Sequence, residues 1–224
     1  MVSNKNILIA QGGGPTNVIN QSLVGIIQQE RKYKSKIFGS INGVNGIINN
    51  RFISLNKVSE KDLKIIANTP GAALGSTRDK PDKKYCKEIL KILRNKEISK
   101  FYYIGGNDSS DSLRIILEYA KDIKYKLQCI HIPKTIDNDL VCNDHTPGFG
   151  SAAKYVAQLF SGVNYDVKSL PGVYLGIVMG RHAGFLTASS SLLKKENDDG
   201  PNLIYIPESP FEINTFLNQI KNVF

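Results

Sequence analysis

The sequence predicts an α/β protein built around a mostly parallel sheet. Apolar segments of strand length alternate with segments of helical character along the chain, and this alternation is typical of βαβ units. Glycine-rich loops follow several of the apolar segments, at the position where open α/β sheets bind their ligands. With 224 residues, of which 41% are hydrophobic, the chain can bury a substantial core in one domain or in two small ones.

In the first part of the chain, each expected strand is a short apolar run, and local signals mark the helices. Pro15 suits the first turn of a helix, Ser59 with Asp62 resembles a capping box, and Ser109 or Ser110 can cap the helix that follows them. The expected strands are residues 6–10, 36–40, 100–104 and 127–132, and the expected helices are residues 15–31, a segment starting near Ser59, and residues 109–121.

The alternation continues to the end of the sequence and predicts a second lobe. The boundary between the lobes is expected within residues 135–148, and we place it after residue 138, which gives lobes of residues 1–138 and 139–224. In the second lobe, the expected strands are residues 173–178 and 203–206, and the expected helices are residues 151–160, 182–194 and 212–223.

Composition argues against several classes of protein. No run of about 18 apolar residues is present, so we expect no membrane span, and no apolar secretion segment precedes the first strand, so we expect a cytoplasmic protein. The net charge is +9, but the lysines are spread over presumed helices, as at residues 83–91 and 121–126. No known nucleic-acid-binding module accompanies them, so we expect no nucleic-acid partner. Such a basic background would favour anionic phosphate substrates by steering. The cysteines and histidines have neither disulfide nor zinc spacing: Cys86, Cys129, Cys142, His131, His145 and His182.

The segment from Pro133 to Asp139 concentrates charge directly after the apolar run 127–132. It carries one cation, Lys134, and two carboxylates, Asp137 and Asp139. One carboxylate can act as a general base toward a hydroxyl, the other can hold a substrate, and the lysine can meet an anion. A solvated loop with acidic turn residues is the alternative. Glycine-rich loops at two other strand ends favour the functional interpretation.

The first of these loops, Gly12-Gly13-Gly14-Pro15, follows the first expected strand. Glycines let the backbone turn tightly and come close to a ligand, and the free N–H groups of a helix start favour a phosphate. The loop lacks the later residues of a dinucleotide fingerprint or a Walker A sequence. A tight turn without a ligand is the alternative.

The second loop, Gly105-Gly106-Asn107-Asp108-Ser109, has the same design. A carboxylate at Asp108 would repel a phosphate unless a cation lies between them. Magnesium resolves this conflict because it takes oxygen ligands and shares them with phosphates. The alternative is that Asp108 and Asp111 only interact favourably with the helix dipole. We expect Asp108 to be a ligand of Mg²⁺.

Two arginines stand in further glycine-containing loops. Arg181 follows the expected strand 173–178 within Met179-Gly180-Arg181-His182-Ala183-Gly184, where it could stabilise charge on a moving phosphoryl group. Arg78 follows Gly75 and supplies another cation. A surface arginine is the alternative for Arg181.

Taken together, these motifs resemble the phosphofructokinase family. The resemblance runs from the first glycine loop to Glu208, and its most specific parts are Thr-Ile-Asp-Asn-Asp at 135–139 and Met-Gly-Arg-x-x-Gly at 179–184. It implies two α/β lobes with mostly parallel sheets, residues 1–138 binding the phosphoryl donor and residues 139–224 binding the sugar phosphate. It also implies transfer of a phosphoryl group to the 1-hydroxyl of fructose 6-phosphate, in glycolysis or gluconeogenesis, with Mg²⁺.

The resemblance also implies a role for each matching residue. Asp137 would be the base, with Arg181 and Lys134 assisting the transfer. Thr135 would lie near the transferred group and Asp139 toward the sugar. Met179, Gly180 and Arg181 would hold the sugar phosphate, and Glu208 the sugar hydroxyls. The donor site would comprise Gly12, Gly13, Arg78, Asn107, Asp108, Ser109 and Lys134.

Two positions bear on the donor. ATP-using members resemble this chain but have glycine at the positions of Asp108 and Lys134. A side chain at 108 would intrude where the α-phosphate of a nucleotide lies, and the Lys134 ammonium could pair with a pyrophosphate oxygen. The resemblance therefore implies a pyrophosphate-dependent, reversible reaction, with ATP as the alternative donor. Asn107 stands where many members have aspartate, so metal binding rests on Asp108.

Family members are longer than this chain, so the second lobe is expected to be incomplete. A catalytic chain that is complete only with a partner or with residues beyond this sequence, and a truncated non-catalytic subunit, both remain open. We expect either a homo-oligomer, dimer or tetramer, or association with a missing C-terminal half. Sedoheptulose 7-phosphate competes with fructose 6-phosphate as the acceptor.

Overall fold

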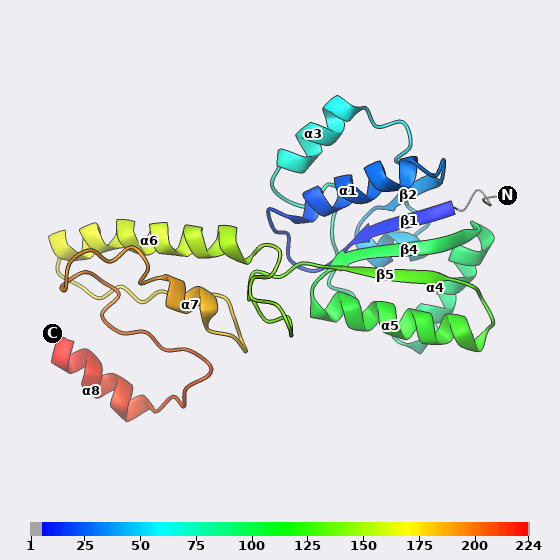
Figure 1. Ribbon diagram of the computed structural model, residues 1–224. Helices are drawn as coiled ribbons and strands as arrows, with labels where there is room; N and C mark the ends of the chain where they lie inside the picture. Colours follow the sequence, from blue (N-terminus) through cyan, green and yellow to red (C-terminus); the bar gives the residue numbers. More distant parts are fainter. Residues whose placement is uncertain (1–5, 224) are drawn as a thin grey trace. The chain divides into compact units, whose positions relative to one another are not determined.

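A computed structural model describes residues 6–223 of the chain. The chain divides into two compact units, Met1–Lys134 and Thr135–Phe224 (Figure 1). The division falls between Lys134 and Thr135, whereas the sequence analysis placed it after residue 138. The described residues contain no helix with the length and apolar character needed to cross a membrane.

The first unit is a five-stranded sheet with the strand order β3-β2-β1-β4-β5. Strands β2, β1, β4 and β5 pair in parallel, and β3 is an antiparallel edge strand beside β2. Its strands are β1 (Asn6–Gln11), β2 (Lys36–Ser40), β3 (Phe52–Ser54), β4 (Ile98–Gly105) and β5 (Gln128–Pro133). Its helices are α1 (Ile19–Arg31), α2 (Gly43–Ile48), α3 (Glu60–Asn68), α4 (Lys83–Asn95) and α5 (Asn107–Asp122). The predicted α/β fold with a mostly parallel sheet is confirmed here.

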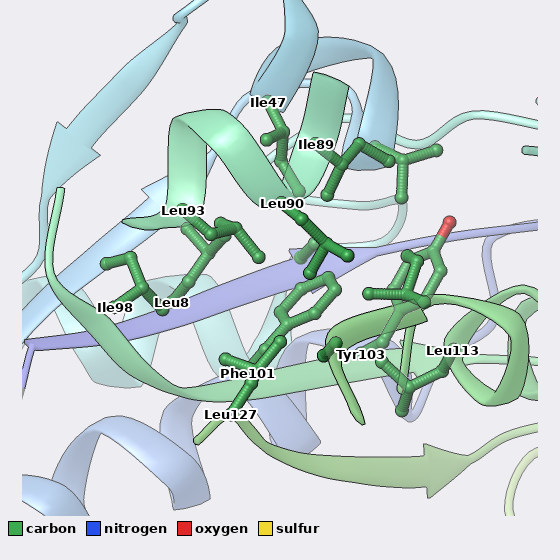
Figure 2. Packing of buried hydrophobic residues seen from close by; sticks show 14 of the residues in the cluster. Leu8, Ile47, Ile89, Leu90, Leu93, Ile98, Phe101, Tyr103, Leu113 and Leu127 are labelled. Atoms are coloured by element: carbon green, nitrogen blue, oxygen red, sulfur yellow. The ribbon is translucent and has the colours of Figure 1, made fainter. Parts of the chain in front are cut away.

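Two apolar clusters cover the two faces of this sheet. On one face, Leu8 of β1 and Phe101 and Tyr103 of β4 pack against Leu90 of α4 and Leu113 of α5 (Figure 2). On the other face, Ile9, Ile37 and Ile104 pack against helices α1 and α3. Successive strand residues point to opposite faces, so β1, β2, β4 and β5 each contribute to both clusters. The sheet is buried on both sides, as parallel sheets are.

Most expected elements of this unit are present within a few residues, but there are corrections. Helix α1 starts at Ile19 instead of residue 15, because residues 12–18 form the glycine loop and a turn. Ser109 and Ser110 do not cap α5: the helix already starts at Asn107, and the Ser109 and Ser110 N–H groups donate to Gly106 O within its first turn. The Ser59 cap is confirmed, since its hydroxyl accepts a hydrogen bond from Asp62 N at 3.1 Å. Elements α2 and β3 were not predicted, and α4 was expected only as a lysine-bearing helix without bounds.

The second unit contains the helices α6 (Phe149–Ser169), α7 (Phe185–Ser189) and α8 (Ile213–Val223). The expected strands at 173–178 and 203–206 are wrong: within the described part of the chain, neither segment pairs with a neighbour, and Figure 1 shows both as irregular ribbon. A strand exists only through its ladder partner, so apolar sequence alone was not enough. The expected helix 182–194 is reduced to α7 followed by turns.

Candidate functional site

Hydrogen bonds hold the first glycine loop, residues 12–14, at the carboxyl end of β1. Gly12 N donates to Ile104 O at 2.8 Å, which joins the loop to β4. Gly13 N donates to Thr77 O at 2.9 Å, and the Ser76 hydroxyl donates to Gly13 O at 2.6 Å. The loop is therefore fixed on one side by the sheet and on the other by the segment that carries Arg78.

Two of the glycines are required by the geometry of the loop. A Cβ on Gly12 would stand 2.6 Å from both Ser109 Oγ and Tyr103 Oη, closer than real Cβ contacts allow. Gly13 has φ of +75°, in the left-handed region that favours glycine. The close approach of β4 and α5 to this backbone explains why side chains are absent here.

Two cations lie beside this loop. Lys134 Nζ is 3.3 Å from the point where a Cβ on Gly13 would stand, and Arg78 Nη2 is 4.0 Å from the corresponding point on Gly14. Lys134 is buried, and its backbone N–H donates to Gly105 O at 3.0 Å, which continues the line of β5. Two cations beside a backbone that carries no side chains make this loop suited to a compact anion.

The second loop leads into α5, with Gly106 as the N-cap residue. Asn107 and Asp108 are exposed in the first turn, whereas Ser109 is buried against the first glycine loop. Asp108 Oδ1 lies 3.1 Å from Lys80 Nζ in an exposed ion pair. Helix α5 thus presents N–H groups and its positive dipole end toward the same region as the glycine loop.

The side chains near Asp108 determine how a magnesium ion could be bound. The described residues include no group of three or more His, Cys, Asp or Glu side chains that could hold a metal ion. Mg²⁺, however, is often bound through one or two carboxylates together with phosphate oxygens and water. Asp108 is exposed and its present partner is a surface lysine, so it fits an ion that arrives with a phosphate ligand.

Tyr103 and His131 support these loops and were missed in the sequence analysis. Burial raises the pKa of Tyr103 to about 12, against the opposing effect of its hydrogen bond with Ser109, so the phenol stays protonated. His131 Nε2 donates to Gly105 O at 3.0 Å, and burial lowers the pKa of this imidazole. The alternation of β4 could have revealed Tyr103, which lies on the strand two residues before the glycine pair.

Asp79 fixes the segment that carries Arg78. Its carboxylate accepts hydrogen bonds from Tyr85 Oη at 2.8 Å and from Asn45 Nδ2 at 3.1 Å. The Tyr85 hydrogen bond is the main cause of a pKa below the usual value for Asp79. Asp79 therefore stays ionised and holds the backbone next to Arg78 in place. Its position beside Arg78 in the sequence could have suggested this supporting role.

In the second unit, hydrogen bonds shape the turn that follows Thr135. The Thr135 hydroxyl accepts from Asp137 N at 3.1 Å, and the Thr146 hydroxyl donates to Thr135 O at 2.8 Å. Asn138 has φ of 59° and is buried; its side chain donates to Asp144 O and accepts from Thr146 N. The sequence analysis gave Asn138 no role, yet it holds the backbone between Asp137 and Asp139.

The 179–184 motif forms a tight turn in which its own backbone atoms approach one another closely. Gly180 has φ of 128°, and a Cβ there would stand 2.2 Å from Ala183 O, so only glycine fits. Gly184 N donates to Glu208 Oε1 at 2.8 Å, which joins two predicted parts of the sugar site, the 179–184 motif and Glu208. Met179 and Arg181 are exposed on this loop.

Comparison with known proteins places the chain in a family. The family model described as Phosphofructokinase matches residues 6–224. The pyrophosphate–fructose 6-phosphate 1-phosphotransferase of Rhodospirillum rubrum is 58% identical over 220 residues, which cover 97% of this chain and 54% of that protein. The ATP-dependent 6-phosphofructokinase of Hamiltonella defensa is 27% identical, with 97% of this chain and 63% of that protein covered.

Comparison with solved structures also finds a phosphofructokinase. The pyrophosphate-dependent phosphofructokinase from Marinobacter aquaeolei matches with a TM-score of 0.84 and 35% identity, over 98% of this chain and 57% of that chain. The chain spans about half the length of the pyrophosphate-dependent relatives that it matches. The family model matches nearly the whole sequence, so the chain belongs to the phosphofructokinase family.

Proposed function

We propose that this chain carries the donor site and part of the sugar-phosphate site of a pyrophosphate-dependent 6-phosphofructokinase. The observation that carries the proposal is the position of Lys134, whose ammonium stands beside the Gly13 backbone at the end of the sheet. A cation at that place favours a compact, highly charged anion over the longer chain of a nucleotide. The name of the relative that is 58% identical supports the same donor.

The donor site would comprise Gly12, Gly13, Arg78, Asn107, Asp108, Ser109 and Lys134. The two cations would offset part of the charge of the diphosphate, and the backbone of the glycine loop would lie against it without side chains in the way. Mg²⁺, when bound, would be held by Asp108 together with phosphate oxygens, and would offset further charge on the donor.

The sugar site would comprise Thr135, Asp137, Asp139, Met179, Gly180, Arg181 and Glu208. Asp137 would take the proton of the 1-hydroxyl as that oxygen attacks a phosphorus of pyrophosphate. The bond from that phosphorus to the bridging oxygen breaks, and orthophosphate leaves with the electron pair. Arg181 would stabilise the charge of the moving phosphoryl group. The hydrogen bond from Asp137 N to Thr135 and the buried Asn138 favour a fixed position for the base.

The wider setting that we propose is reversible phosphorylation of fructose 6-phosphate in glycolysis or gluconeogenesis, in the cytoplasm. A homo-oligomer, or association with a C-terminal half, is part of this proposal. A non-catalytic subunit is the second candidate, and it would bind phosphate ligands through the glycine loop and the two cations beside it. ATP as donor and sedoheptulose 7-phosphate as acceptor remain the competing substrates.

Turnover measurements test the proposal. The purified chain is given fructose 6-phosphate and magnesium with either pyrophosphate or ATP, and Asp137→Ala is compared with Asp111→Ala, which removes an exposed carboxylate of α5. Turnover with pyrophosphate that only Asp137→Ala abolishes supports the proposed reaction. Turnover with ATP but not with pyrophosphate would refute pyrophosphate as the phosphoryl donor. Pyrophosphate binding without turnover would favour the non-catalytic subunit.

A further inference from the structure

Arg78 lies in a segment of the first unit that has no regular secondary structure. Residues 69–82 connect α3 to α4 and contain only bends, turns and irregular backbone. Connections of this length are uncommon in compact domains unless they serve a function. Arg78 is exposed, so the place of its guanidinium beside the glycine loop depends on the backbone that carries it. Neither a strand nor a helix fixes that backbone, and contacts with other elements must do so.

Gln11 is the first of two buried amides that hold this segment. It is the last residue of β1, directly before the glycine loop, and its exposed fraction is 0%. Its Oε1 accepts a hydrogen bond from Leu74 N at 2.9 Å. Its Nε2 donates to Ile19 O at 3.2 Å and to Asn20 Oδ1 at 3.1 Å. One side chain therefore joins the end of β1, the start of α1 and the irregular segment.

Asn20 is the second buried amide, with an exposed fraction of 1%, and it lies in the first turn of α1. Its Oδ1 accepts from Ala73 N at 2.9 Å, and its Nδ2 donates to Thr69 O at 2.9 Å. A backbone N–H can only donate, so Ala73 and Leu74 fix the orientation of both side-chain amides. Each polar atom of the Gln11 and Asn20 side chains has a hydrogen-bond partner.

Packing alone does not explain two amides at these positions. Two of their hydrogen-bond partners, Ile19 and Leu74, belong to the apolar cluster between the sheet and α1. A buried amide costs free energy unless its groups are bonded, and each hydrogen bond contributes only about 1 kcal/mol net, so apolar side chains of similar size would stabilise this core about as well. Unlike apolar contacts, hydrogen bonds select individual backbone groups. The distinguishing effect of the network is therefore the fixed position of residues 69–74.

The backbone carries this position on to the glycine loop. Leu74 O accepts from Asn42 N at 2.8 Å, so Leu74 is held at both its N–H and its C=O. Residues 76–77 then bond the N–H and the C=O of Gly13. A slip of this segment by one residue would move Arg78 by about 3.3 Å. A displacement of that size is enough to break a hydrogen bond.

We propose that Gln11 and Asn20 are positioning residues of the donor site. They hold residues 69–78 against the ends of β1 and α1, and this places Arg78 where it can bind pyrophosphate. Neither amide touches the donor, and their effect on binding passes through Arg78. The proposal rests on the proposed function for the identity of the ligand and for the role of Arg78.

A double-mutant cycle tests whether the effect passes through Arg78. Magnesium pyrophosphate is titrated calorimetrically into Gln11→Met, Arg78→Met and the double variant. We expect roughly 10-fold weaker binding in Gln11→Met, because a charge-assisted hydrogen bond is lost or weakened. The double variant should bind as Arg78→Met does, since a misplaced residue that is already removed has no further effect. Additive losses, or an unchanged affinity in Gln11→Met beside a loss in Arg78→Met, would overturn the proposal.

Two further variants guard this test against a folding defect. Asn20→Leu should repeat the result of Gln11→Met, and either variant decides the matter if thermal unfolding shows that the other does not fold. Gln21→Met is the matched control, because Gln21 is an exposed residue of α1 whose Nε2 donates to Ala67 O of α3 at 3.0 Å, outside the irregular segment. It should bind pyrophosphate as the unmodified chain does. An equal loss in Gln21→Met would contradict a specific role for the buried amides.

Amide hydrogen exchange without ligand separates this proposal from the proposed function. In Gln11→Met the amides of residues 73–78 should exchange at least about 10-fold faster, whereas those of Gln21→Met should not change. Unchanged exchange in Gln11→Met would overturn the positioning role. Faster exchange together with full pyrophosphate affinity in Arg78→Met would instead count against the proposed function, since the segment would be held as proposed while Arg78 would not bind the donor.

Discussion

Replacing Lys134 with methionine tests the proposed donor site at its most specific residue. The substitution keeps a long, buried side chain and removes the ammonium that stands 3.3 Å from the Cβ position of Gly13. A hydrogen bond between charged groups contributes about 1.5–3 kcal/mol. At about 1.4 kcal/mol for each factor of ten, pyrophosphate should bind roughly 10- to 150-fold more weakly.

Calorimetric titration with magnesium pyrophosphate measures this loss. Lys87→Met is the matched control, because it removes the same charge from an exposed position of α4. Thermal unfolding of each variant separates a folding defect from a binding defect. An unchanged affinity in Lys134→Met, or an equal loss in Lys87→Met, would refute the assignment of Lys134 to the donor.

Three further predictions concern the support of this site. Gly12→Ala should lower the free energy of unfolding by about 1–3 kcal/mol, because the new Cβ would stand 2.6 Å from Ser109 and Tyr103. Gly14→Ala is the control and should change that free energy little, because its Cβ would meet no atom closer than 4.0 Å. Equal urea unfolding midpoints for the two variants would contradict this prediction. Tyr103→Phe should recover part of that loss in the Gly12→Ala background, since it removes one of the colliding oxygens; strictly additive losses in a double-mutant cycle would count against the predicted contact. Burial lowers the pKa of His131 in the folded protein below its ordinary value of 6.5. As the pH decreases below 6.5, the unfolded chain binds the proton before the folded protein does, so the free energy of unfolding should decrease as the pH decreases. His131→Gln should flatten that part of the stability profile, measured by urea unfolding, and an unchanged slope would show that other groups cause it.

The sheet of the first unit was predictable because its strands carry their own signal. The apolar runs at 6–10, 36–40, 100–104 and 127–132 each lie within an observed strand or differ from it by one or two residues. The glycine loops were located by the same logic, since they interrupt such runs. Helix α4 was expected only as a lysine-bearing helix without bounds, although its buried face recurs at helical spacing: Cys86, Ile89, Leu90 and Leu93 form that face.

The second unit was predicted less well, for a physical reason. An apolar run such as 173–178 has the composition of a strand, but strand formation depends on a partner that is absent from the described residues. Contacts between residues several positions apart also decided the roles that were missed. Tyr103 reaches Ser109, and Asn138 reaches Thr146 across a turn. Neither contact follows from local sequence, although asparagine at 138 is a residue type that tolerates the left-handed region.

The proposed donor is tested most directly by comparing pyrophosphate with ATP as ligands of the same chain. Both are titrated calorimetrically, with magnesium, into the unmodified chain and into the Lys134→Gly, Asp108→Gly double variant. We predict that the unmodified chain binds pyrophosphate more tightly than ATP and that the double variant shifts the ratio toward ATP. Tighter binding of ATP by the unmodified chain, or a ratio that the double variant leaves unchanged, would contradict a pyrophosphate-dependent enzyme.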